Sequence, residues 1–154
     1  MFNPQRPHFP DGTLRDALTY PQPAAQYSND PLRQVLSDAM LLQLASWLDF
    51  HAAWGQKLSG GDQQRLTIAR RLRKKPQCIT VVEATAALDE LAENTLYGKL
   101  QAHVLAVGGG TELIAHRTRV TAFHSKQWVL EKLAKGAAAR HDLKESALPP
   151  AGTA

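Results

Sequence analysis

The sequence predicts an α/β fold with a parallel sheet, and two observations lead to this prediction. The β-branched run at 78–82 has no apolar–polar alternation, which is typical of a strand covered on both faces. Helical periodicity at 59–75 and 89–104 flanks this run, and two further short strands are predicted at 112–115 and 127–131. Strands that alternate with helices favour parallel pairing, because parallel neighbours need a long crossover connection.

The composition is that of one globular domain of ordinary size. The chain has 154 residues, of which 44% are hydrophobic and 21% charged, and this excludes a disordered polar chain. No apolar stretch reaches the ~20 residues of a membrane-spanning helix, and the N-terminus has no signal-peptide pattern. The single cysteine, Cys78, lies in an apolar run, where we expect it to be buried, and it fits a reducing compartment.

The formal net charge is +4, and much of the positive charge is concentrated near the end of one predicted helix. The residues concerned are Arg70, Arg71, Arg73, Lys74 and Lys75. Cations at a helix C-terminus are favoured by the helix dipole, and this is the simplest interpretation. A nucleic-acid-binding surface is the alternative, although aromatic residues are not interleaved with the basic ones as single-strand binders prefer.

The first fifty residues predict an extended entry followed by short helices. Three prolines in 1–10 favour an extended chain, and a break follows at 20–29. Asp30 is a candidate N-cap and Pro31 suits a first helical position, and a second apolar helix is predicted over 40–48. Near its end is an aromatic cluster that we expect to belong to the core, formed by Trp47, Phe50 and Trp54.

The clearest predicted helix starts at Ser59, where a serine precedes Asp62 by the spacing of a capping box. Its apolar face is expected to hold Leu66, Ala69 and Leu72, with Ile68 beside them. Pro76 ends it. The helix over 89–104 has Leu96, Leu100 and Val104 in register, and the glycines at 108–110 predict a turn.

The segment 58–65, LSGGDQQR, indicates an anion-binding turn. A serine and two glycines lead directly into a helix, so the backbone can approach an anion and the first-turn N–H groups point at it. As a string, the segment resembles the signature motif of ABC-transporter ATP-binding domains, usually LSGGQ or LSGGEQQR. An ordinary capped helix after a Gly-Gly turn is the alternative.

Three further segments resemble motifs of the same family, in the order that the family requires. EATAALD at 83–89 resembles the end of the Walker B strand and the D-loop, His116 in IAHR resembles the switch histidine, and Gln5 in NPQRPHFPDGTL resembles the Q-loop glutamine. Each is weak alone. Together they make the chain similar to the C-terminal half of an ABC-transporter ATP-binding domain over about residues 3–132.

The resemblance narrows to one branch of that family. PQRPHFPDGTLRDALTYP, Trp54 shortly before the signature, and the ending HRTRVTAFH resemble peroxisomal fatty-acyl transporters and their bacterial permease–ATPase relatives. Transport specificity in such systems lies in the membrane domain, so the resemblance implies no substrate.

The resemblance implies a partial P-loop NTPase core with a helical subdomain, lacking the N-terminal β-subdomain and the Walker A loop. We expect a Q-loop segment over 1–20 and a helical subdomain with the signature over 21–75. The Walker B, D-loop and H-switch half follows over 76–132, and a flexible tail over 133–154.

Two features weaken the expectation of autonomous catalysis. The family's phosphate cradle is GxxxxGK followed by Ser or Thr, and no such string occurs in the 154 residues. The family's Walker B aspartate is replaced by Val82, which offers no oxygen to a magnesium ion. We therefore expect a truncated ABC ATPase subunit that has little activity alone, and bound magnesium is not expected.

The resemblance also implies roles, partners and a location. Glu83 and His116 are the candidate catalytic residues. The candidate ATP-contacting residues are Gln5, Ser59, Gly60, Gly61, Gln63 and Asp89. ATP is expected to be shared with a partner protomer. The expected partner is a transporter membrane domain or an intact ABC ATPase domain. The expected location of the chain is cytoplasmic, peripheral at the inner face of the cell membrane through a transporter partner. The second hypothesis is a non-catalytic module that pairs in trans with an intact ABC ATPase domain. The third is a basic nucleic-acid-binding protein.

Overall fold

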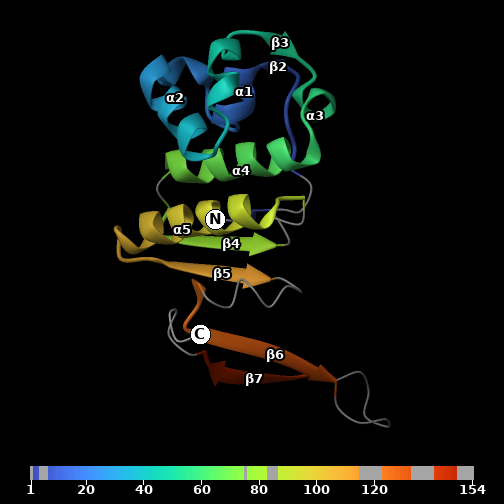
Figure 1. The fold of residues 1–154 in the computed structure, drawn as a ribbon, viewed down its shortest axis with the longest axis vertical. Helices are drawn as coiled ribbons and strands as arrows, with labels where there is room; N and C mark the ends of the chain where they lie inside the picture. Colours follow the sequence, from blue (N-terminus) through green and yellow to red (C-terminus); the bar gives the residue numbers. More distant parts are fainter. Residues whose placement is uncertain are drawn as a thin grey trace. The chain divides into compact units, whose positions relative to one another are not determined.

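A computed structural model shows how the chain folds (Figure 1). The chain divides into two compact units, Met1–Ala115 and His116–Ala154. No helix within the described ranges has the length and apolar content needed to cross a membrane. The structure describes residues 2–3, 7–74, 76–82, 87–114, 123–132 and 141–148.

The first unit contains a three-stranded parallel sheet in the order β1-β4-β5. The strands are β1 (Phe2–Asn3), β4 (Cys78–Val82) and β5 (Gly110–Ile114). Between β4 and β5 the chain forms the predicted helix, α5 (Glu90–Leu105), whose N-cap is Asp89. The predicted parallel α/β arrangement is therefore confirmed, because α5 is the crossover that parallel neighbours require.

Only one face of strand β4 is buried. Ile79 and Val81 are 0% and 2% exposed, whereas Cys78 is exposed. On the face of Cys78, the Thr80 hydroxyl donates a 3.0 Å hydrogen bond to the Glu112 carboxylate, and Ile114 is 53% exposed. The prediction of a strand covered on both faces, with a buried cysteine, is therefore wrong for the described residues. The run lacks alternation because Cys78 and Thr80, although exposed or half-exposed, are small and β-sheet-compatible.

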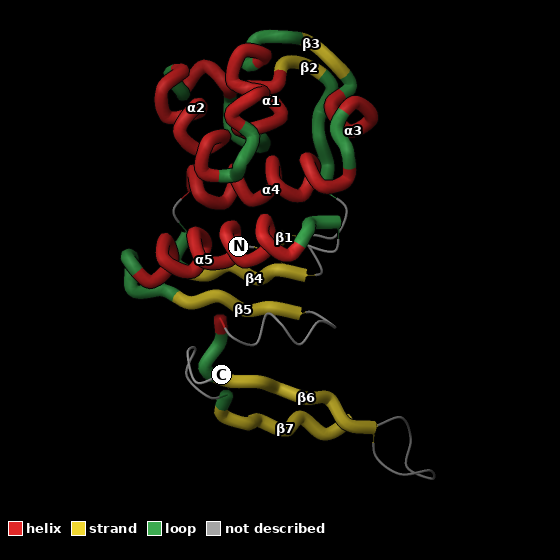
Figure 2. Tube along the Cα trace, viewed as in Figure 1, coloured by secondary structure: helices red, strands yellow, loops and turns green. Residues whose placement is uncertain are grey.

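The helical part of the first unit precedes β4. It comprises α1 (Leu14–Thr19), η1 (Ala24–Gln26), α2 (Asn29–Asp38), η2 (Leu42–Trp47), α3 (Trp54–Lys57) and α4 (Gly60–Lys74). A two-stranded antiparallel pair connects the residues before α1 with those before α3: β2 (Gly12–Thr13) and β3 (His51–Ala52). Figure 2 shows α5 between α4 and the strands β4 and β5.

Two boundaries differ from the sequence prediction. Helix α2 has Ser28 as its N-cap, so Asp30 is not the cap. Asp30 lies in the first turn, where its carboxylate interacts favourably with the helix dipole. The segment predicted as a helix over 40–48 forms the shorter 3₁₀ helix η2. Met40, with a φ of 59°, separates η2 from α2, because a left-handed residue cannot continue a right-handed helix.

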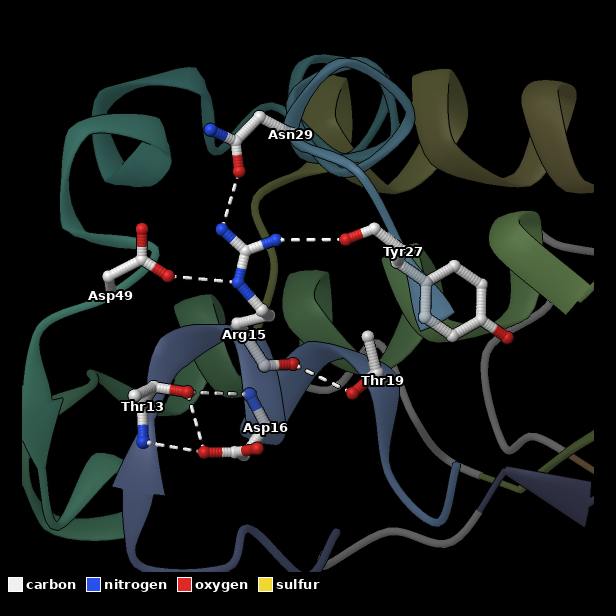
Figure 3. A network of polar contacts seen from close by, with 7 residues as sticks. All are labelled: Thr13, Arg15, Asp16, Thr19, Tyr27, Asn29 and Asp49. Atoms are coloured by element: carbon white, nitrogen blue, oxygen red, sulfur yellow. Dashed lines mark hydrogen bonds and ion pairs between the residues drawn. The ribbon is translucent and has the colours of Figure 1, made fainter. Parts of the chain in front are cut away.

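Arg15 ties three chain segments together (Figure 3). Its Nε lies 2.9 Å from the Asp49 carboxylate, and its terminal nitrogens donate to the Tyr27 carbonyl, at 3.1 Å, and to the Asn29 side chain. The Asp49 side chain is 73% exposed, so its ion pair is screened and contributes little. The bonds to 27 and 29 fix the entry to α2 against α1.

Helix α1 begins with a complete capping box (Figure 3). The Thr13 hydroxyl oxygen accepts from the Asp16 N–H, and the Asp16 carboxylate accepts from the Thr13 N–H. The hydroxyl of Thr13 also donates to that carboxylate, and these bonds hold the pKa of Asp16 below its ordinary value. A helix of six residues is marginal by itself, so this cap is a substantial part of its local stabilisation.

The predicted apolar stripe of α4 is confirmed. Leu66 and Ala69 are fully buried, Ile68 is 1% exposed and Leu72 is 7% exposed. Helix α4 packs against α1 and α2 and also against α5. Burial on both sides explains why Ile68, beside the Leu66 stripe, is covered as well.

The second unit contains an antiparallel hairpin of β6 (Lys126–Lys132) and β7 (His141–Ala147). Strand β6 confirms the strand predicted at 127–131. Strand β7 lies within 133–154, where we predicted a flexible tail. The cross-strand ion pairs Lys126–Glu145 and Lys144–Glu131 are 2.7 and 2.6 Å long and support the pairing. Because β7 has only one large apolar residue, Leu143, its sequence gives little strand signal.

A pair of glycine substitutions tests the backbone description. A Cβ at Gly98, inside α5, would meet nothing within 4 Å, whereas one at Gly109 would lie 1.7 Å from the Gln77 carbonyl oxygen. We expect Gly98→Ala to raise the free energy of unfolding by ~0.5–1 kcal/mol, because alanine loses less backbone entropy in a helix. Gly109→Ala should lower it. Urea denaturation measures both, and a destabilising Gly98→Ala would contradict the placement of Gly98 on an open helix surface.

Candidate functional site

The segment LSGGDQQR forms the start of helix α4, with its first residues exposed. Leu58 is buried and anchors the turn, whereas Ser59 and Gly60 face solvent. The Ser59 hydroxyl oxygen accepts from the Asp62 N–H at 3.2 Å, and the hydroxyl donates to the Asp62 carboxylate at 2.7 Å. The predicted cap on α4 is confirmed. An exposed amide end on a 15-residue helix is favourable for an anion.

The charge at this end is balanced by Arg65. Asp62, in the first turn, puts a negative charge where an anion would approach. Arg65 lies 3.6 Å from the Asp62 carboxylate and 3.7 Å from that of Asp89. The guanidinium therefore offsets both carboxylates, and it links α4 to the residue that caps α5.

The two glycines permit close packing of the chain before α5. A Cβ at Gly61 would lie 3.2 Å from the Ala87 carbonyl oxygen, and one at Gly60 would lie 3.6 Å from the Ala87 Cβ. The motif predicts that these glycines allow an anion to approach the backbone. The structure adds a second reason at Gly61, because a larger residue there would push against the backbone at Ala87.

Gln64 joins the same two segments by a hydrogen bond that the sequence analysis missed. Its side-chain oxygen accepts from the Ala87 N–H at 3.0 Å, and the residue is 8% exposed. Its position in the sequence could have indicated this role, because Gln64 is three residues after Gly61 and so lies on the same helix face. A polar residue on a face that is otherwise packed needs an internal partner.

The Gln63 side chain braces the turn before α4. Its amide nitrogen donates to the carbonyls of Gly55 and Leu58, at 2.9 and 3.1 Å. In this arrangement the donors of Gln63 are directed to backbone oxygens of its own chain. Its contact with a terminal phosphate stays a prediction.

The structure brings together part of the predicted set. Ser59, Gly60, Gly61 and Asp89 lie around Arg65 and Ala87 through the contacts above. The Asp89 carboxylate accepts from the Ala92 N–H at 2.8 Å and so begins α5. Gln63 lies in the same helix, with its amide directed to Gly55 and Leu58. Three other predicted site residues lie outside the described residues: Gln5, Glu83 and His116.

An aromatic cluster lies on the chain that leads to the signature segment. Trp54 is fully buried, as predicted, and its indole N–H donates to the Gly12 carbonyl at 3.1 Å. Trp47 and Phe50 are 44% and 53% exposed, so the prediction that they are core residues is wrong. Their rings are covered in part by the Lys57 ammonium, which lies 4.8 and 4.4 Å from the two ring centroids. Cation–π attraction of this kind stabilises an aromatic ring that remains partly exposed to solvent.

The basic cluster near the end of α4 is partly structural. Arg70 is 6% exposed and donates to the carbonyls of Ala17 and His8, at 2.6 and 2.8 Å. Arg73 donates to the Thr19 carbonyl at 2.9 Å. These arginines thus bind backbone oxygens of the first unit, which the prediction of simple helix-end charges did not include. Lys75 lies outside the described residues.

Comparison with known proteins gives a consistent result. No family model matches the chain. An uncharacterised ABC transporter ATP-binding protein of Haemophilus influenzae is 36% identical over 136 residues, which is 85% of this chain and 22% of that protein. ABC transporter D family member 1 of Arabidopsis thaliana is 33% identical over 135 residues, covering 80% of this chain and 9% of that protein. A solved bacterial Atm1-family ABC exporter with ATP bound matches with a TM-score of 0.72 and 29% identity, over 84% of this chain and 23% of that one.

These matches confirm the resemblance that the motifs indicated. Most of this chain is homologous to ABC-transporter ATP-binding proteins, and its structure has a partial ABC-ATPase-like fold. Its relatives include D-family transporters, among them a mouse lysosomal cobalamin transporter that is 34% identical over 140 residues. The chain spans about a fifth of the length of several of these relatives: 22% for the Haemophilus protein and 20% for one from Synechocystis.

The link between α4 and the chain before α5 can be tested at Gln64. We expect Gln64→Leu to lower the free energy of unfolding by ~1–3 kcal/mol, because the Ala87 N–H loses its acceptor. Gln56→Leu, at an exposed position in α3, is the control and should change it by less than ~0.5 kcal/mol. Chemical denaturation measures both. Equal effects of the two substitutions would contradict the role of Gln64.

Proposed function

We propose that this chain acts as part of an ABC-transporter ATP-binding domain and presents its signature surface to ATP held by another such domain. The observation that carries the proposal is the exposed start of α4 at Ser59 and Gly60. The family resemblance supplies the arrangement: its ATP-binding domains pair head to tail, and the signature of one closes on the nucleotide of the other. In such a pair, this chain would bind the partner domain and close its signature surface over the partner's ATP.

The start of α4 suits a terminal phosphate better than a whole nucleotide. First-turn N–H groups and glycine allow an anion to approach closely, and the Ser59 hydroxyl can leave Asp62 to donate to it. Arg65 offsets the Asp62 charge that would oppose the anion. The 154 residues contain no GxxxxGK string, so the cradle for the inner phosphates lies outside them.

The chain is a poor match for magnesium. Val82 occupies the position of the family's Walker B aspartate, and valine has no oxygen for a hard cation. We therefore derive no step through a metal at this position. Glu83, the carboxylate expected to orient water, would have no phosphate clamp beside it within this chain.

The proposal includes a membrane-bound partner. A transporter's membrane domain would hold the chain at the inner face of the membrane, and the segment over residues 5–13 is the proposed contact by family resemblance. An intact ABC ATPase domain would supply the phosphate cradle. Both partners are consistent with relatives that are ABC transporter proteins.

Capture by an intact ABC ATPase domain tests the trans arrangement. We expect that domain, immobilised with ATP and magnesium, to retain this chain, and to release it when ATP is omitted. Gly60→Asp should weaken retention at least ~10-fold, because the added carboxylate repels the phosphate. Gly55→Asp is the matched control, since a Cβ there meets nothing within 4 Å. Retention that ignores ATP, or equal losses for the two variants, would count against the proposal.

The second test is hydrolysis by the chain alone. We expect purified chain to release phosphate from ATP no faster than a buffer blank, because it lacks the Walker A cradle and the Walker B aspartate. A coupled phosphate assay measures this. Steady release that Glu83→Gln abolishes would show that the chain hydrolyses ATP by itself.

A further inference from the structure

A cavity of about 210 Å³ lies at the opposite end of α4 from the signature segment. One wall is formed by the rings of Pro7, Tyr20 and Pro21. The other wall is cationic and comes from the last turns of α4, with Arg70, Arg71 and Lys74. None of the described residues that line it is acidic.

A buried guanidinium nitrogen in this wall has no hydrogen-bond partner. Arg70 is 6% exposed, and two of its nitrogens donate to the carbonyls of Ala17 and His8. Its third nitrogen, Nη2, is buried and donates to no described group. A buried donor without an acceptor is costly. The guanidinium recovers part of this cost by lying over the Phe9 ring, whose centroid is 4.4 Å from its Cζ, and its charge remains beside the cavity.

The cations of this wall also disfavour one another. Burial, together with the charges of Arg73, Arg71 and Arg70, lowers the pKa of Lys74. Burial, with a contribution from Arg71, lowers the pKa of Arg70 to about 10. The like-charge contributions show that these cations lie close enough to affect one another, so a negative charge in the cavity that they line would interact favourably with each of them.

We propose that this cavity binds one oxyanion, a carboxylate or a phosphate. Planar guanidinium groups match the oxygen pairs of both anions, and the lysine adds a point charge. The rings of Tyr20 and the two prolines would contact the apolar part of a ligand that carries such a group. This site is independent of the signature surface and goes beyond the proposed function.

Titrations of the full chain with inorganic phosphate and with acetate test the proposal. Ionic strength is held constant with sodium chloride, and the Arg70 Nε–H signal and the amides near Tyr20 are followed by ¹H–¹⁵N NMR. We expect saturable shifts with at least one of the two anions. Tighter phosphate binding would identify phosphate as the ligand type, and acetate binding at least as tight would identify a carboxylate.

Variants separate a built site from general charge attraction. Lys74→Gln and, separately, Arg71→Gln should each weaken binding about tenfold, the loss of one charge-assisted contact. Arg33→Gln removes the same charge from an exposed position of α2 and should leave affinity within about twofold. The proposal is overturned if neither anion gives saturable shifts, if chloride alone reproduces them, or if both cavity variants bind like Arg33→Gln.

Discussion

The structure of the first unit depends on the burial of α4 on opposite sides. This helix packs on α1 and α2 on one side and on α5 on the other. Seven of its residues are buried, and three of these are polar: Gln64, Thr67 and Arg70. Because a buried polar group without a partner is costly, these three side chains must bond inside the protein.

Each of the three has a hydrogen-bond partner: two of the bonds connect α4 to other segments, and one lies within the helix. Gln64 accepts from the Ala87 N–H, Thr67 donates to the Gln63 carbonyl one turn earlier, and Arg70 donates to the Ala17 carbonyl at the end of α1. The bonds of Gln64 and Arg70 thus fix the register of α4 against its neighbours, while its buried apolar side chains, Leu66 and Ile68 among them, pack on both sides. Fixing this register also fixes the position of the signature segment, since that segment is the first turn of the same helix.

The sequence was sufficient for the elements with strong local signals. Helix α4 with its cap at Ser59, the helix after Asp89 and the strand at Cys78 could be predicted, because capping residues, periodicity and a β-branched run are local features. It failed at Met40, whose left-handed backbone is unusual for a side chain of that size. The exposure of Phe50 could not be foreseen either, because it depends on Lys57 covering its ring from a separate element.

The candidate site was predictable as a string and less so as a geometry. The glycines and Ser59 were found from the motif, whereas the role of Gln64 requires knowing that Ala87 lies against the helix. Tertiary contacts of this kind have no sequence spacing. For the same reason, the interpretation of Arg70 as a helix-end charge missed its bonds to Ala17 and His8, which lie more than fifty residues earlier.

The two anion sites that we propose, one at each end of α4, would act by different physical means. At the start, backbone amides and glycine allow close approach, and the local charges of Asp62 and Arg65 largely cancel. Near the end, side-chain cations dominate and the backbone is not involved. The helix has 15 residues, so its ends are separated by about 22 Å, well beyond the ~8 Å screening length of physiological salt. An anion at one end therefore has little electrostatic effect on the other, and any coupling between the ends must pass through the packing of α4 itself.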